Sequence, residues 1–164
     1  MAIEHGMHDD NILLLAAQTH ATTGNVARSI ELAQEVLQKK PNHEPARFLL
    51  ATQLNQAGKH HQALLYAQTL LAEHPNDPAH AILIGEIHEA MGEIDLAFLA
   101  YQSVLRSIPG SVVALVKTAE LAAGQGDCDT ARDAASKIPL DEIERTTLLP
   151  ATAKLCGEAG AAQP

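Results

Sequence analysis

Aromatic residues are scarce in this sequence: they make up 2% of its 164 residues and include no Trp. The hydrophobic fraction is nevertheless 46%, enough for a sizeable core in one domain. Alanine and leucine must fill that core, and such residues favour closely packed helices over layers of strands. The composition therefore predicts an all-α protein. The four aromatic residues are Phe48, Tyr66, Phe98 and Tyr101.

Positive charge is scarce as well. The formal net charge is -9, and the segment from His60 to Leu105 contains no Lys or Arg. This composition argues against a general affinity for nucleic-acid phosphates or anionic lipids, because both depend on basic side chains. Basic partners are easier to accommodate.

Long apolar runs are absent. The first ten residues, MAIEHGMHDD, have no basic start and no apolar signal core. The longest apolar run extends from Ile12 to Ala17, far short of the roughly 18 residues that a membrane span needs. We expect no membrane insertion and a cytoplasmic location.

Cysteine occurs only twice, at Cys128 and Cys156, and forms no CxxC motif. One widely spaced pair in a chain of this size is typical of incidental thiols rather than of a disulfide framework. We predict that both cysteines are reduced.

A repeat of 34 residues runs through the chain. The glycines of one series are Gly24, Gly58, Gly92 and Gly126, and Pro41, Pro75 and Pro109 each follow one of the first three by seventeen residues. A second series with the same period contains Ser29, Ala63, Ala97 and Ala131. Two helical patterns per unit at such a period indicate a solenoid of four helix pairs.

Each recurring residue has a mechanical reason. Glycine accepts the positive φ at which the chain leaves one helix and reverses. A small residue five positions later allows the second helix to approach the first closely. Proline then stops the second helix. The leucines four residues before each proline should pack onto the next repeat: Leu37, Leu71 and Leu105.

With these residues the chain resembles the tetratricopeptide repeat family. The best match spans 78–111, with Gly85, Gly92, Ala97, Tyr101 and Pro109 at the family's positions. Residues 10–43 and 44–77 match more loosely, with Ala17 and Ala51 where the family has a first-helix glycine. The resemblance implies a right-handed α-solenoid of antiparallel helix pairs. It is weak for function, since the repeat serves unrelated assemblies.

The expected organisation is an N-terminal tail (1–8), four repeats within 9–137 and a C-terminal capping helix with a flexible tail (138–164). The repeats cover 10–43, 44–77, 78–111 and 112–137. Pro139 should end the last repeat's second helix around Lys137. Asp141 and Glu144 then form a capping-box pattern for a helix that shields the last apolar face.

The chain contains no complete catalytic motif. GQGDCD, from Gly124, lacks the strand and the lysine of a phosphate loop, and DCDTARD has Arg132 where a calcium loop needs glycine. No HExxH or nucleophile elbow occurs. We predict a protein that is not an enzyme and has no cofactor.

Histidine is plentiful, with nine residues. Five of them lie in the segment without Lys or Arg, beside several carboxylates, which makes divalent-metal binding conceivable. We favour ordinary packing and surface roles and predict no metal site, with His20 and His88 as half-buried spacers. The five are His60, His61, His74, His80 and His88.

The resemblance implies a concave groove lined by the first helix of each repeat. The candidate groove residues are Leu14, Gln18, Phe48, Thr52, Asn55, Ile82, Glu86, Glu89, Val116 and Glu120, with Pro45 and Ala79 among the other mapped positions. Lys117 is the only cation nearby, which argues against a clamp for a C-terminal carboxylate. The alternative for Leu14, Phe48 and Ile82 is packing between neighbouring first helices.

We therefore expect an adaptor that holds a protein or peptide segment in this groove. Stacked repeats should place Glu86 beside Glu120, so the partner should carry a basic residue there and an apolar residue near Phe48 and Ile82. Two alternatives remain open: a module that assembles into homo-oligomers, and a helper domain of a larger enzyme.

Overall fold

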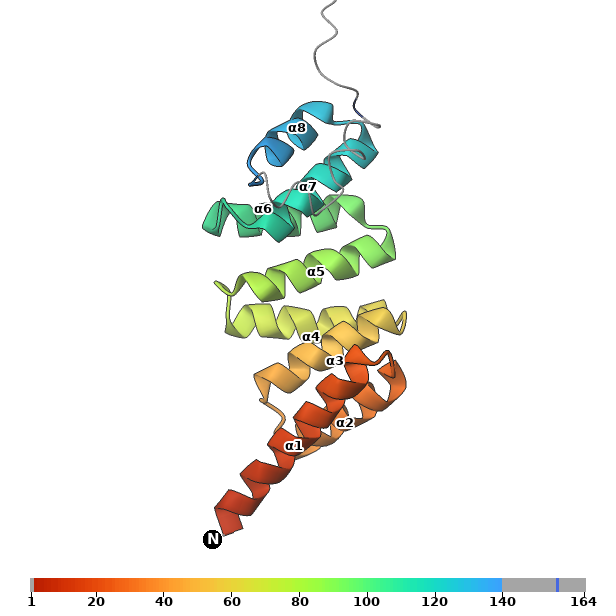
Figure 1. Cartoon of the computed structure of the whole chain (residues 1–164), viewed down its shortest axis with the longest axis vertical. Coiled ribbons are helices and arrows are strands. Elements are labelled where there is room, and N and C mark those ends of the chain that lie inside the picture. The colour runs from red at the N-terminus through yellow and green to blue at the C-terminus, as the bar shows by residue number, and fades with distance from the viewer. Residues whose placement is uncertain (1, 140–155, 157–164) are drawn as a thin grey trace, which may run out of the picture. The chain divides into compact units, whose positions relative to one another are not determined.

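The computed structural model describes the backbone of residues 2–139 and 156, and side chains at residues 10–139 and 156. Within residues 2–139 it contains eight helices and no strand, which confirms the all-α class (Figure 1). The predicted capping helix, with Asp141 and Glu144, lies outside the described residues. The helices are α1 (Ala2–Thr22), α2 (Val26–Lys39), α3 (Glu44–Gln56), α4 (His60–Glu73), α5 (Pro78–Met91), α6 (Ile94–Ser107), α7 (Val112–Gln125) and α8 (Cys128–Ser136).

The chain divides into two compact units, Met1–Met91 with α1 to α5 and Gly92–Pro164 with α6 to α8. The division falls within the predicted repeat 78–111, and the repeat boundaries themselves stay a prediction. Helix α1 begins at Ala2 and so includes residues that the sequence assigns to an N-terminal tail. That segment has one glycine and no proline, so nothing in it stops a helix.

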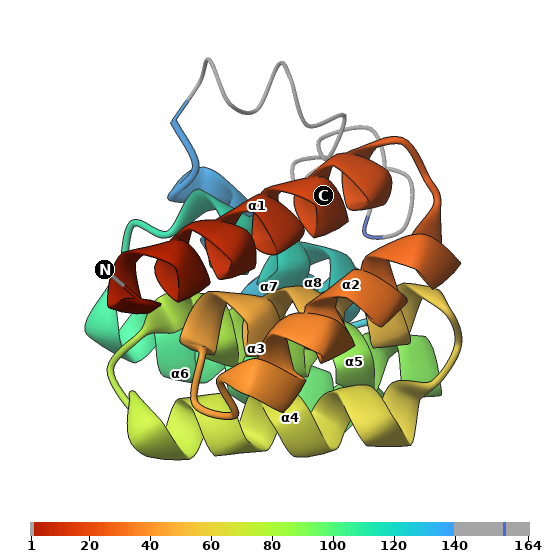
Figure 2. The same cartoon turned by 90° about the horizontal axis from the view of Figure 1, so that it is seen from below.

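In the first unit, helices pair in chain order. Helix α1 packs against α2 and α3 against α4, while α2 contacts α3 and α4 contacts α5 (Figures 1 and 2). Leu50 of α3 and Leu70 of α4 are fully buried. Burying each such leucine stabilises the fold by roughly 1.5 to 3 kcal/mol. The core consists largely of leucine and alanine, as the composition predicts.

The turns follow the predicted repeat. Gly24, Gly58, Gly92 and Gly126 all have positive φ, between 75° and 81°. Five residues after each glycine, the small side chains of Ser29, Ala63, Ala97 and Ala131 are completely buried at 0% exposure. Helices α2, α4 and α6 each end two residues before the predicted stopping proline: Pro41, Pro75 and Pro109.

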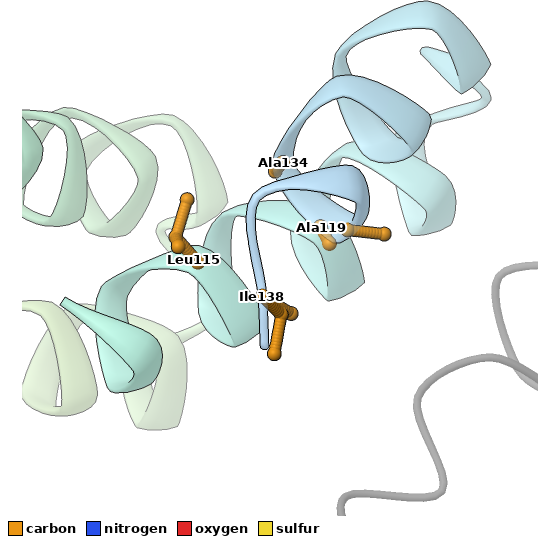
Figure 3. Packing of buried hydrophobic residues seen from close by; sticks show 5 residues of the cluster. Leu115, Ala119, Ala134 and Ile138 are labelled. Atoms are coloured by element: carbon orange, nitrogen blue, oxygen red, sulfur yellow. The ribbon is translucent and has the colours of Figure 1, made fainter. Parts of the chain in front are cut away.

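The second unit has its own apolar cluster between α7 and α8 (Figure 3). Leu115 and Ala119 of α7 meet Ala134 of α8 and Ile138 just beyond it, and Leu105 of α6 packs against this cluster as expected. Helix α8 ends at Ser136 with Lys137 as its C-cap, close to the predicted end. Pro139 explains this end, because it disfavours a helical conformation at the residue before it.

The prediction of two reduced cysteines is wrong. Cys128 and Cys156 form a disulfide across a sequence separation of 28 residues, with Cα atoms 5.1 Å apart. Cys156 packs against the buried alanines that join α7 to α8, which brings it to Cys128 at the start of α8. The spacing of the two cysteines in the sequence does not predict that they meet, because the packing around α7 and α8 brings them together.

No helix in the described part of the chain is long and apolar enough to cross a bilayer.

Candidate partner-binding pocket

A pocket of about 420 Å³ opens on the first unit. Residues of α1, α3 and α5, which are the first helices of three predicted repeats, meet there. Gln18 comes from α1, Phe48 and Thr52 come from α3, and Ala79 comes from α5. Sequence reasoning had placed all four on a groove. The complete lining is Gln18, Glu44, Pro45, Phe48, Leu49, Thr52, Asp77, Ala79 and His80.

Phe48 contributes apolar surface to the pocket. Pro45, Phe48 and Thr52 follow one another at intervals of three and four residues along α3, so they lie on one helix face. Phe48 is half-buried, and its ring centroid lies 5.9 Å from that of His80. The hydroxyl of Thr52 donates to the backbone carbonyl of Phe48 at 3.0 Å. This wall therefore offers mainly apolar contacts to a ligand.

One side of the pocket is acidic and was missed by sequence reasoning. Glu44 opens α3, and Asp77 precedes α5 and accepts a hydrogen bond from the Ala79 amide at 2.9 Å. His80 is only 2% exposed, and its Nε2 lies 3.5 Å from Glu44 Oε1. His74 Nε2 lies 3.2 Å from the other oxygen of Glu44. Acidic residues are common at helix starts, so the sequence alone does not distinguish Glu44 and Asp77 from ordinary helix caps.

Arg47, the basic residue of α3, forms an ion pair with Glu73 and not with the acidic residues that line the pocket. Arg47 is 6% exposed and binds Glu73 of α4 through both guanidinium arms, at 2.9 Å and 2.7 Å. The Arg47 hydrogen bond holds the pKa of the Glu73 carboxyl below its usual value, although partial desolvation opposes the shift. This pair fixes α3 against α4. The described partners of Glu44 are histidines.

Five of the predicted groove residues in the first unit do not line this pocket. Leu14 and Ile82 are half-buried, which fits the alternative of packing between helices. Asn55 Oδ1 lies 2.7 Å from His60 Nδ1. On α5, Glu86 is exposed and Glu89 is half-buried. Their contact with a partner stays a prediction.

Two predicted groove residues belong to the second unit. Val116 packs against the cluster between α7 and α8, so at least part of its surface serves the core. Glu120 is exposed, and Lys117 Nζ lies 3.9 Å from its Oε2. Glu86 belongs to the first unit, so its pairing with Glu120 stays a prediction.

Comparison with known proteins points to one family. Residues 20–87 match a sequence model described as tetratricopeptide repeat. No curated protein matches the sequence.

Several solved structures share the fold. A thermophilic tetratricopeptide repeat protein of Thermus thermophilus is 19% identical, with a TM-score of 0.74 over 89% of this chain and 80% of its own. MamA of Desulfovibrio magneticus is 21% identical, also with a TM-score of 0.74, over 87% of this chain and 80% of its own.

A further match is the first tetratricopeptide repeat domain of Spaghetti, solved with the HSP90 peptide SRMEEVD. It is 14% identical, with a TM-score of 0.64 over 71% of this chain and 92% of its own. At these identities the likenesses show an all-α solenoid fold of the tetratricopeptide type and leave the partner open.

Proposed function

We propose, from the premise that this chain belongs to the tetratricopeptide repeat family, that it is a non-enzymatic adaptor holding an extended partner segment on its first helices. One observation carries the proposal. Groove positions that the family resemblance maps onto α1, α3 and α5 meet in a single pocket around Phe48. A pocket of about 420 Å³ suits one or two side chains of a bound segment.

The charge of the pocket favours a basic partner. Spaghetti was solved with a peptide, SRMEEVD, whose last residues are mainly acidic. Here Glu44 and Asp77 line the pocket, and Arg47 is held by Glu73. A carboxylate entering this pocket would meet like charges, whereas a Lys or Arg would be attracted. We propose a segment with an apolar residue against Phe48 and a basic residue toward Glu44 and Asp77. The sequence-based prediction of basic residues near Glu86 and near Glu120 is kept as a separate proposal.

A peptide array tests this specificity. The full-length, disulfide-intact protein is applied to peptides that combine one apolar residue with Lys, Arg, Glu or neutral neighbours. We expect binding to apolar and basic peptides that weakens with rising salt, and none to SRMEEVD-like acidic peptides. Retention of acidic peptides in place of basic ones would contradict the proposal.

Variants assign the binding to the pocket. Phe48→Ala should mainly speed dissociation, because it removes the apolar anchor. Changing Glu86 and Glu120 together to Gln tests the acidic positions outside the pocket that the sequence predicts, and it should slow association and flatten the salt dependence. Leu65→Ala serves as the control, since Leu65 is 66% exposed on α4 and does not line the pocket. Equal effects of Phe48→Ala and Leu65→Ala would place the site elsewhere.

Self-assembly is a second candidate because α1 carries an exposed apolar strip. Ile12 and Leu15 lie three residues apart on this helix and are 55% and 64% exposed. A second copy could cover them. Sedimentation across a range of concentrations tests this, and Leu15→Lys should abolish any association that uses the strip.

The disulfide also bears on location. Disulfides persist in oxidising compartments and are rare in the cytoplasm. We therefore favour an oxidising compartment over the cytoplasmic location expected from the sequence. The test is to treat intact cells with a maleimide before lysis. Cysteines that stay unlabelled support the oxidising compartment, and labelled cysteines support the cytoplasm.

A further inference from the structure

We infer that Glu44, Asp77 and His80 form a binding site for one divalent metal ion with the preferences of zinc. Each residue offers one ligand atom, and these atoms all lie within 4.8 Å of one another. The inference goes beyond the proposed function and does not depend on it, and a bound ion would compete with a basic residue of the partner for Glu44 and Asp77. It also departs from the expectation that every histidine serves packing or the surface.

The geometry needs only a small adjustment. Zinc binds nitrogen and carboxylate oxygen at about 2.0 to 2.2 Å, so ligand atoms around a tetrahedral ion lie about 3.4 Å apart. Since no two ligand atoms are more than 4.8 Å apart, a contraction of at most about 1.4 Å is needed, which is within reach of side-chain rotation. The two carboxylates would balance the charge of the ion. His74 Nε2 lies 3.2 Å from Glu44 Oε2, at the edge of this cluster.

His80 separates this cluster from an ordinary acidic patch. The side chain is 2% exposed and lines the pocket beside both carboxylates. Its Nδ1 is buried with no hydrogen-bond partner among the described residues, while Nε2 faces Glu44. A neutral imidazole has one N–H donor and one lone pair, and carboxylates satisfy only the donor. In the tautomer with the proton on Nδ1, the lone pair of Nε2 faces Glu44, and a metal ion held between them is a partner for that lone pair.

Helix capping accounts for only part of the cluster. Asp77 caps the first turn of α5, and Glu44 lies in the first turn of α3, where negative charge is favourable. Capping does not require a buried histidine next to both carboxylates. Nor does any Lys or Arg occur from His60 to Leu105 to compete with a cation there. Both cysteines are bonded to each other, so the candidate ligands are nitrogen and oxygen.

The experiment titrates zinc chloride into the full-length, disulfide-intact protein, free of tags and chelators, in a calorimeter. We expect one ion per chain and a rise in melting temperature, because an ion bound only by the native state stabilises it. Glu44→Gln and Asp77→Asn should each weaken binding at least tenfold and remove most of the rise in melting temperature. Both variants keep the size of the side chain, so the test does not depend on replacing the buried His80.

His61→Asn is the matched control. His61 is exposed at the start of α4, and this variant should bind zinc like the original protein. Circular dichroism checks that every variant is folded. The inference is overturned if the unaltered protein shows no one-to-one binding. It is equally overturned if the two carboxylate variants bind as the original does, since the ion would then sit on surface histidines.

Discussion

Two glycines at the end of α7 should respond in opposite directions to the same substitution. Gly126 is the C-cap of the helix with φ of 81°, and its amide bonds back to the carbonyls of Ala122 and Ala123. Gly124 lies two residues earlier, inside the helix, at a φ open to any residue. Both are exposed, and a Cβ built on either meets no atom within 4 Å. An added methyl group therefore makes no packing contact at either position, and the effect of alanine on stability depends only on the backbone conformation.

The magnitudes follow from that backbone difference. Alanine at position 126 must adopt the left-handed conformation, which costs roughly 1 to 2 kcal/mol. Alanine at position 124 removes the entropy that glycine loses in a helix, which gains about 0.5 to 1 kcal/mol. Gly126→Ala and Gly124→Ala should thus differ in unfolding free energy by roughly 2 kcal/mol, or about 4 to 8 °C in melting temperature.

Urea denaturation of both variants, with the disulfide intact, measures the difference. The slope of free energy against urea should stay constant while the midpoint falls for Gly126→Ala and rises for Gly124→Ala. A neutral Gly126→Ala, or a shift of both midpoints in one direction, would refute the assignment of a left-handed turn there.

Two further predictions concern bonds between elements. Replacing both Cys128 and Cys156 with Ser should lower the unfolding free energy by about 3.6 kcal/mol, because the unfolded chain regains the entropy of a 28-residue loop. If both cysteines of the native protein are alkylated without reductant, the bond is absent and this prediction fails. The pKa of Glu73 is lowered below 4.5 in the folded protein, so this group stabilises the fold above that pH and loses its effect as pH falls through the folded value. The difference in melting temperature between Glu73→Gln and the original protein should therefore shrink below pH 4.5, and a difference that stays constant with pH would count against the pair with Arg47.

Much of the fold could be predicted because the repeat ties local geometry to residue type. A glycine every 34 residues marks a positive φ, and the structure has one at each of the four positions. The buried Ala63 and Ala97 follow from the same period, since close helix contact excludes larger side chains. Helix ends were predictable from prolines for the same local reason.

The site was only partly predictable because it depends on contacts between repeats. The family resemblance maps Gln18, Phe48 and Thr52 onto one groove, and they do line one pocket, while their contact with a partner stays a prediction. His80 was considered as a metal ligand and not favoured, and its approach to Glu44 was not predicted, because residues 36 positions apart meet only when α3 and α5 lie side by side. The disulfide was mispredicted for a similar reason: the partner cysteine approaches through packing and not through spacing.

The bond between Cys128 and Cys156 changes how a cut in the chain would look. A protease that hydrolyses one peptide bond between these residues leaves two fragments that the disulfide still joins. On a gel without reductant the nicked protein keeps nearly its original size, and the fragments separate only after reduction. Samples stored with trace protease could therefore pass as intact, and fragmentation should be judged with and without reductant.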